Sequence, residues 1–100
     1  MKVTINSVHF KADKKLTSFI EQKVDKLSGF YDGIIGGDVS LKVTNQNDKE
    51  NKVTEIRLKV RGDDLFAKKQ SNTFEEATDL AVDALKKQLT KHKEKVRKKY

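Results

Sequence analysis

The chain has no cysteine, proline or tryptophan among its 100 residues, and only two histidines. Without cysteine it forms no disulfide, thiolate nucleophile or thiolate metal site. No apolar run approaches the roughly 20 residues of a membrane-spanning helix. Polar and apolar residues alternate from Met1 onward, where a signal peptide would have an apolar stretch. We therefore expect a soluble cytoplasmic protein.

Residues for catalysis are equally scarce. His9 and His92 are far apart in the sequence, and no zinc signature, nucleophile elbow or phosphate-binding glycine loop is present. Because His92 falls on an apolar helix face, we interpret it as a packing residue. The glycines at positions 33, 36 and 37 are interpreted as turn residues.

Three acidic side chains share one side of a predicted helix, at Glu76, Asp79 and Asp83, and suggest a weak magnesium site. The alternative is stronger, because acidic residues are stabilising in the first half of a helix and Asp83 has Lys87 four residues on. We expect no enzyme activity, no cofactor and no metal.

Hydrophobic periodicity divides the chain into strands and helices. Four segments alternate apolar and polar side chains and are predicted as strands: 3–10, 39–43, 54–60 and 65–71. The alternation changes phase near Ser7, which predicts an irregularity there. A polar loop from Asn45 to Asn51, expected to be mobile, joins the second and third strands, and a tight turn at Gly62 to Asp64 precedes the last strand.

Helical spacing appears twice. Apolar residues three and four apart predict a first helix over about 13–28, with Asp13 as N-cap and Gly29 as the C′ residue. Phe30 and Tyr31 are expected to pack beneath it. The second helix begins with a capping box at Thr73 to Glu76 and runs to about Lys98. At about 26 residues it would be longer than the strands, so its basic end should extend beyond the sheet.

The order β-α-β-β-β-α predicts an α+β two-layer sandwich, with a four-stranded sheet and both helices on one face. One hundred residues make a single domain, 1–100.

The positive charge is concentrated at the C-terminal end. Residues 86–100 contain eight Lys or Arg and one Glu, whereas the rest of the chain has fourteen basic and fourteen acidic residues. Cations stabilise only about the last turn of a helix, so this array exceeds what the helix needs and indicates a polyanion-binding surface. With Ala84 taken as the centre of the buried face, the following residues fall together on the solvent side: Lys86, Lys87, Lys91, Lys93, Arg97 and Lys98. Lys23 and Lys26 on the first helix, and Lys68 and Lys69 on the last strand, are candidates to extend this surface.

Three segments together resemble the short hibernation-promoting factors, the group that includes the ribosome-associated inhibitor protein Y. Residues 88–95, QLTKHKEK, look like the family's QLxKHKxK signature. Residues 77–79 match its small-apolar-Asp step, and Lys26-Leu27 followed by Phe30-Tyr31 matches the end of its first helix. The resemblance covers essentially the full length.

This resemblance implies a factor that binds the small ribosomal subunit in the decoding channel, covers the A and P sites, and excludes tRNA and mRNA in stress or stationary phase. The implied partners are the small subunit and the 70S ribosome, with a separate hibernation factor as a further partner. Carried over by motif, the RNA contacts are Lys23, Lys26, Lys86, Lys87, Lys91, Lys93 and Lys95. Many relatives have a basic residue early in the first helix, where this chain has Thr17, so the RNA contact at that position is in doubt. Because the chain ends at Tyr100, we expect no dimerisation through a C-terminal domain.

Other classes of function remain open from the sequence. A general structured-RNA-binding protein would need the same basic surface. A small ferredoxin-like enzyme such as an acyl phosphatase would need an anion-binding loop, which we cannot assemble around Arg57, Arg61 or Asn72. An oligomerisation module would use an exposed sheet edge.

Overall fold

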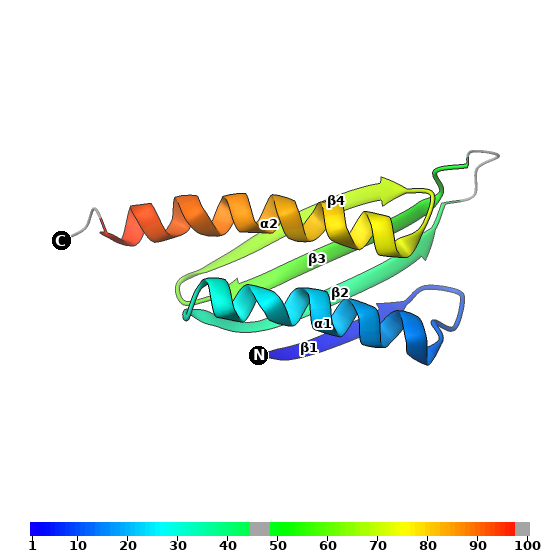
Figure 1. The fold of residues 1–100 in the computed structure, drawn as a ribbon, viewed down its shortest axis with the longest axis horizontal. Coiled ribbons are helices and arrows are strands. Elements are labelled where there is room, and N and C mark those ends of the chain that lie inside the picture. The colour runs from blue at the N-terminus through cyan, green and yellow to red at the C-terminus, as the bar shows by residue number, and fades with distance from the viewer. Residues whose placement is uncertain (45–48, 98–100) are drawn as a thin grey trace.

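The strands and helices follow the predicted order, as the computed structural model in Figure 1 shows. The model describes residues 1–44 and 49–97. The elements are β1 (Lys2–Ser7), α1 (Lys14–Phe30), β2 (Ile34–Val43), β3 (Lys52–Val60), β4 (Asp63–Ser71) and α2 (Phe74–Arg97). Of the predicted loop from Asn45 to Asn51, residues 45–48 lie outside the described residues.

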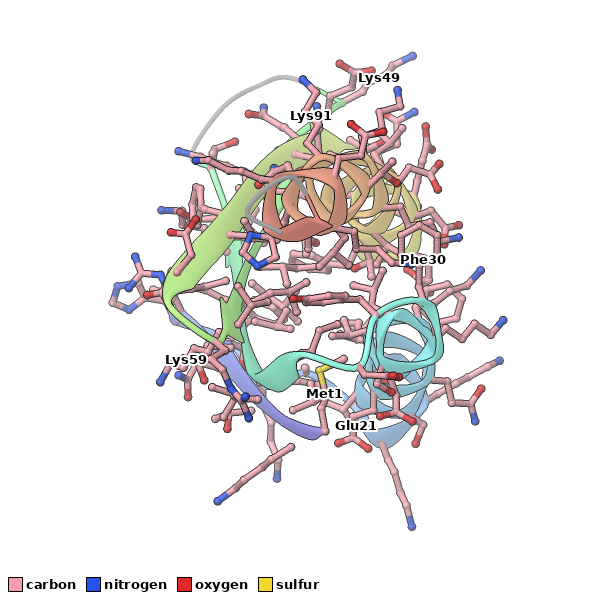
Figure 2. All side chains as sticks on the ribbon, turned by 90° about the vertical axis from the view of Figure 1, so that its left-hand side faces the viewer. Met1, Glu21, Phe30, Lys49, Lys59 and Lys91 are labelled. Carbon is pink, nitrogen blue, oxygen red and sulfur yellow. The ribbon has the colours of Figure 1, made fainter. Side chains whose placement is uncertain are left out.

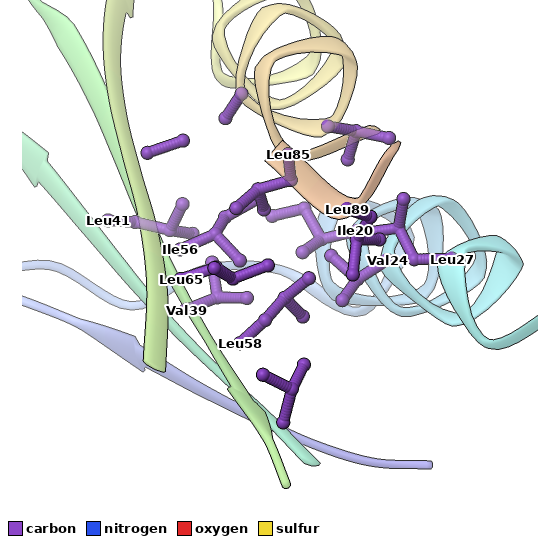
Figure 3. Packing of buried hydrophobic residues seen from close by; sticks show 14 of the residues in the cluster. Ile20, Val24, Leu27, Val39, Leu41, Ile56, Leu58, Leu65, Leu85 and Leu89 are labelled. Carbon is purple, nitrogen blue, oxygen red and sulfur yellow. The ribbon is translucent and has the colours of Figure 1, made fainter. Parts of the chain in front are cut away.

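One sheet of four strands, in the order β1-β2-β3-β4, forms the first layer. β1 pairs in parallel with β2, and α1 makes the crossover between them. β2, β3 and β4 follow as an antiparallel meander. Both helices lie on the same face of the sheet (Figures 1 and 3), which confirms the predicted two-layer sandwich.

The core fills the space between the sheet and the two helices (Figure 3). Alternation along the strands directs every second side chain to this face, while the three- and four-residue spacing on the helices gives each an apolar stripe. The largest side chains that are fully buried in this cluster are Ile20, Val24, Leu27, Val39, Leu41, Ile56, Leu58, Leu85 and Leu89. The core thus joins both helices and the strands into one unit.

A polar contact lies inside the packed layers. The hydroxyl groups of Thr54 on β3 and Thr78 on α2 are 3.3 Å apart, and both residues are fully buried. Each hydroxyl therefore has a partner, which avoids the cost of burying an unpaired polar group. This bond links α2 to β3 inside the core.

The prediction that Gly36 and Gly37 are turn residues is wrong. Both lie within β2, where they pair with Lys2 and Val3 of β1. A side-chain carbon at Gly37 would lie 3.4 Å from methyl carbons of both Val24 and Leu58. The small residue therefore allows α1 to approach the sheet closely. Gly33 does lie in a turn, as expected.

The predicted start of α1 is correct, but its predicted end is wrong. Asp13 caps the helix by accepting a hydrogen bond from the backbone N–H of Leu16 at 2.8 Å. Gly29 was predicted to end the helix but lies inside it, and Tyr31 is the C-cap, with its N–H donating to the Leu27 carbonyl at 3.1 Å. The helix continues two residues beyond its predicted end, and Phe30 is exposed, so the expectation that Phe30 packs beneath α1 is also wrong.

The irregularity predicted near Ser7 occurs at the end of β1. Pairing with β2 stops at Ser7, and His9 adopts a left-handed conformation with φ of 63°. The chain then directs Phe10 onto the first residue of α2, where the Phe10 and Phe74 rings stack at 5.2 Å between centroids. This contact anchors the β1–α1 connection to the second helix.

The turn between β3 and β4 consists of Arg61 and Gly62, one residue earlier than predicted. Gly62 has φ of +83°, a conformation that glycine adopts without steric cost. In the part of the chain that is described, no helix is both long and apolar enough to cross a membrane.

We expect replacement of Leu85 by alanine to lower the free energy of unfolding by about 2–5 kcal/mol, because it empties a fully enclosed site. Leu80 lies on the same helix but is 43% exposed, so Leu80→Ala is the matched control and should cost less than about 1 kcal/mol. Urea denaturation followed by circular dichroism measures both. Similar losses from the two variants would contradict the assigned orientation of α2.

Candidate nucleic-acid interface

The orientation of α2 about its own axis determines where its lysines point. Its start is fixed by Thr73, whose hydroxyl oxygen accepts a hydrogen bond from the backbone N–H of Glu76 at 3.1 Å. This confirms the Thr73 half of the predicted capping box. The buried face is centred on Leu85 and not on Ala84, which is only partly buried. The predicted solvent face is therefore displaced by one residue, or about 100°.

This displacement divides the lysines between two flanks of the helix. Lys86 and Lys93 fall on the flank toward α1, and Lys93 contacts α1 directly. Lys87, Lys91 and Lys95 fall on the outer surface and on the flank toward β4. In Figure 2, which looks along the molecule from the C-terminal end of α2, Lys91 lies on the side of α2 away from α1. The basic residues consequently form two rows and not one face.

Lys93 is committed to a contact within the protein. Its ammonium group donates a hydrogen bond to the carbonyl of Phe30, the last residue of α1, at 2.9 Å. The same nitrogen lies 4.7 Å from the centroid of the Phe30 ring. A cation at a helix C-terminus is stabilising, and so is a cation over an aromatic face. Lys93 thus fastens α2 to the end of α1.

A second contact joins the helices nearer their beginnings. The ammonium group of Lys23 on α1 lies 3.1 Å from the carboxylate of Asp79 on α2, and also 5.5 Å from the centroid of the Phe19 ring. Lys23 is therefore partly neutralised. Asp79, one of the three acidic residues considered as magnesium ligands, is thus the ion-pair partner of Lys23.

The other five predicted RNA contacts are available to a ligand. Among the described residues, no ion pair or hydrogen bond engages their ammonium groups, and all five side chains are exposed: Lys26, Lys86, Lys87, Lys91 and Lys95. Lys26 on α1 lies on the side that faces α2, one turn from Lys23. The helical side of the sheet therefore carries candidates from both helices, in separate rows (Figure 1).

A shallow groove runs between the end of α2 and the start of β4. Its lining includes Lys91, Lys95, His92 and Asp63. Gln88 holds this part of α2 on the sheet, because its side-chain amide donates to the Phe66 carbonyl at 2.8 Å. Two lysines thus project from a position that is fixed relative to β4.

His92 has the packing role that its sequence position indicates. Its ring meets Tyr31 edge to face, with 5.5 Å between centroids. Its Nε2 atom is buried and has no hydrogen-bond partner within the described ranges. Tyr31, which follows α1, is in this way packed against the end of α2.

The basic end of α2 extends past the sheet, as Figure 1 shows, but by less than the sequence predicted. β3 and β4 have nine residues each, about 30 Å, whereas α2 has 24 residues, about 36 Å. Lys91 and Lys95 still lie beside the start of β4. Lys98, where the helix was predicted to end, lies outside the described residues.

Sequence periodicity did not find the contact between Phe30 and Lys93, because these residues are 63 positions apart. A helical pattern reports only neighbours on the same helix. In Figure 2 Phe30 lies in the seam between α1 and α2. Lys68 and Lys69, the strand candidates, are both exposed on β4.

Residues 3–97 match the model of one protein family, described as "Sigma 54 modulation protein / S30EA ribosomal protein". The chain is 30% identical over 100 residues to the ribosome hibernation promotion factor of Bacillus subtilis, and it spans 52% of the length of that relative. It is 29% identical over 97 residues to the ribosome hibernation promoting factor of Klebsiella oxytoca, covering 98% of that protein and 97% of this chain.

Two solved structures share the fold. A ribosomal subunit interface protein from Coxiella burnetii superposes with a TM-score of 0.81 at 20% identity, covering 93% of this chain and 98% of that one. The N-terminal domain of Thermus thermophilus Protein Y gives a TM-score of 0.79 at 19% identity, covering 92% of this chain and 99% of that one.

We expect Lys93→Met to lower the free energy of unfolding by about 1 kcal/mol, because it removes the ammonium group at the end of α1 and keeps the apolar stem. Lys91→Met is the matched control, since Lys91 is exposed and unpaired among the described residues, and it should change stability by less than about 0.5 kcal/mol. Thermal unfolding compares the two. Equal stability in both variants would show that the Lys93 contact does not hold the helices together.

Proposed function

Because the chain belongs to the Sigma 54 modulation protein / S30EA ribosomal protein family, we propose that it is a ribosome hibernation factor. It binds the small ribosomal subunit in the decoding channel, covers the A and P sites and excludes tRNA and mRNA. It acts in the cytoplasm on small subunits and 70S ribosomes, in stress or stationary phase. The observation that carries the proposal is the family match over residues 3–97.

The names of the similar proteins support the ribosome as the binding partner. The relatives from Bacillus subtilis and Klebsiella oxytoca are named for ribosome hibernation, and the Coxiella burnetii protein is described as a ribosomal subunit interface protein. The curated relatives include one that is matched over nearly its whole length. A relative of about this length therefore carries the same kind of name as the longer Bacillus subtilis protein.

The charge distribution supports an RNA ligand. Lysine side chains neutralise phosphates and release condensed counterions, which makes binding favourable and sensitive to salt. The five exposed lysines without partners in the described part of the chain project from two helices that are packed on a common core. Such a fixed array suits the recognition of folded RNA by its shape, because its groups keep a constant spacing.

The mechanism is steric exclusion and contains no catalytic step. Lys26, Lys86, Lys87, Lys91 and Lys95 bind phosphates of ribosomal RNA. Lys23 and Lys93 add contacts between two helices that the core already holds together, so phosphates bound by α1 and by α2 keep a constant spacing. The bound protein then occupies the volume that tRNA and mRNA need.

Addition of the protein to a cell-free bacterial translation system should reduce initiation, and initiator tRNA bound beforehand should compete with it for 30S subunits. Sedimentation of 30S subunits with labelled protein and labelled tRNA measures the occupancy of each. Full occupancy by both at once would overturn the decoding-channel assignment and leave general binding of structured RNA.

Four lysine-to-glutamine changes at Lys86, Lys87, Lys91 and Lys95 should weaken co-sedimentation with ribosomes while the fold survives, because glutamine keeps good helix propensity. If each lysine contacts one phosphate, the slope of log affinity against log salt becomes shallower by about three units. Binding measured over a series of salt concentrations gives this slope.

The matched control carries four lysine-to-glutamine changes at the other end of the molecule, at Lys11, Lys14, Lys15 and Lys49, all exposed. This control should retain most of the affinity. Equal losses in the two variants would mean that net charge governs binding, and the assignment of α2 as the RNA-binding element would be wrong.

A further inference from the structure

The face of the sheet opposite the helices is open, since no described helix or strand covers it. Figure 2 shows Lys59 projecting from this face, away from both helices. The strand registers place two rows of side chains across it. The first row is Thr4, Asp38, Arg57 and Phe66, and the second is Asn6, Ser40, Glu55 and Lys68.

These rows form a shallow groove. Its lining includes side chains of all four strands, namely Asn6, Asp38, Ser40, Glu55, Arg57 and Phe66. Neighbouring strands are about 4.8 Å apart, so a ligand of a few ring widths reaches several of these residues at once. The groove therefore offers an aromatic ring, a guanidinium group, an amide and a hydroxyl group within one short span.

Phe66 stands out because it is an aromatic side chain among polar ones. It is 45% exposed, and the guanidinium carbon of Arg57 lies 6.0 Å from the centroid of its ring. Arg57 and Phe66 are direct partners in the β3–β4 register. A ring that is exposed beside a cation is well suited to stack on a planar ligand.

The acidic groups at the groove are already neutralised. The carboxylate of Glu55 lies 3.0 Å from the ammonium group of Lys42, and that of Asp38 lies 3.5 Å from Lys59. Arg57 and Lys68 have no such partner within the described residues. With Lys42, Lys59 and Lys68 around the groove, this face of the sheet retains positive charge, which favours an anionic ligand.

We propose that this open sheet face is a binding site for single-stranded RNA, distinct from the helical face and independent of the proposed function. One unpaired base stacks on Phe66, and Arg57 and Lys68 bind the flanking phosphates. The hydroxyl of Ser40 and the amide of Asn6, two and three strands away from Phe66, bond with a neighbouring nucleotide. Sheet-borne aromatic rings that stack unpaired bases are a common basis of single-stranded RNA recognition. A protein partner fits less well, because Phe66 is the sole apolar side chain in the two rows and forms no extended apolar patch.

The test uses a fluorescein-labelled oligouridine of about ten nucleotides, which is within the usual length range of such sites. Its affinity is measured by fluorescence anisotropy at low salt. The protein carries the four glutamine changes on α2, so that the helical lysines contribute little. Phe66→Leu should weaken binding about fivefold or more, and Phe66→Tyr, which keeps a ring, should restore it. Arg57→Gln should also weaken binding.

Arg61→Gln is the matched control, since Arg61 is an exposed arginine in the neighbouring turn and outside the groove. It should leave the affinity for oligouridine unchanged, and circular dichroism checks that every variant is folded. Equal affinity in Phe66→Leu, Phe66→Tyr and the parent would overturn the proposal. If Phe66→Leu then weakened binding to ribosomes without affecting oligouridine, the face would be a protein contact instead.

Discussion

The burial of Leu85 and Leu89 between the sheet and α1 is the constraint on which the arrangement of the charged surface depends. Both side chains are fully enclosed, and together they fix the rotation of α2 about its axis. A rotation by one residue would expose two leucines, at about 1.5–3 kcal/mol each. Surface ion pairs contribute about 1 kcal/mol or less, so they cannot set this rotation. The core decides where the lysines point.

Within that frame, the lysines have unequal roles. Lys23 and Lys93 bridge α1 and α2 near opposite ends of the contact between the helices, through Asp79 and through the Phe30 carbonyl. Both contacts are partly exposed and individually modest, but they act on elements already packed together. They add to an arrangement of the remaining lysines that the core has already set. A basic cluster of this kind therefore contains groups that shape the surface as well as groups that can bind a phosphate.

The two sides of the sheet offer different chemistry. The helical side carries lysines on a rigid scaffold, with the Phe30 ring already in contact with Lys93. The open side carries Phe66 beside Arg57, and its carboxylates are balanced by Lys42 and Lys59. The first arrangement suits the phosphates of folded RNA, and the second suits the base of an unpaired nucleotide. Both follow from one four-stranded sheet that is covered on a single face.

The sequence by itself determined the order of elements, the start of each helix, the inward face of each strand and the concentration of charge after residue 85. These depend on local spacing and on capping groups such as Asp13 and Thr73, which act within a few residues. It did not determine that Gly36 and Gly37 lie in β2, because their neighbours come from distant segments: a side chain would meet the Lys2 carbonyl of β1 at Gly36, and Val24 of α1 at Gly37. Nor did it determine the centre of the buried face of α2 or the partner of Lys93. Only the tertiary structure decided these, because packing and a contact between residues 63 positions apart depend on how distant segments meet in space.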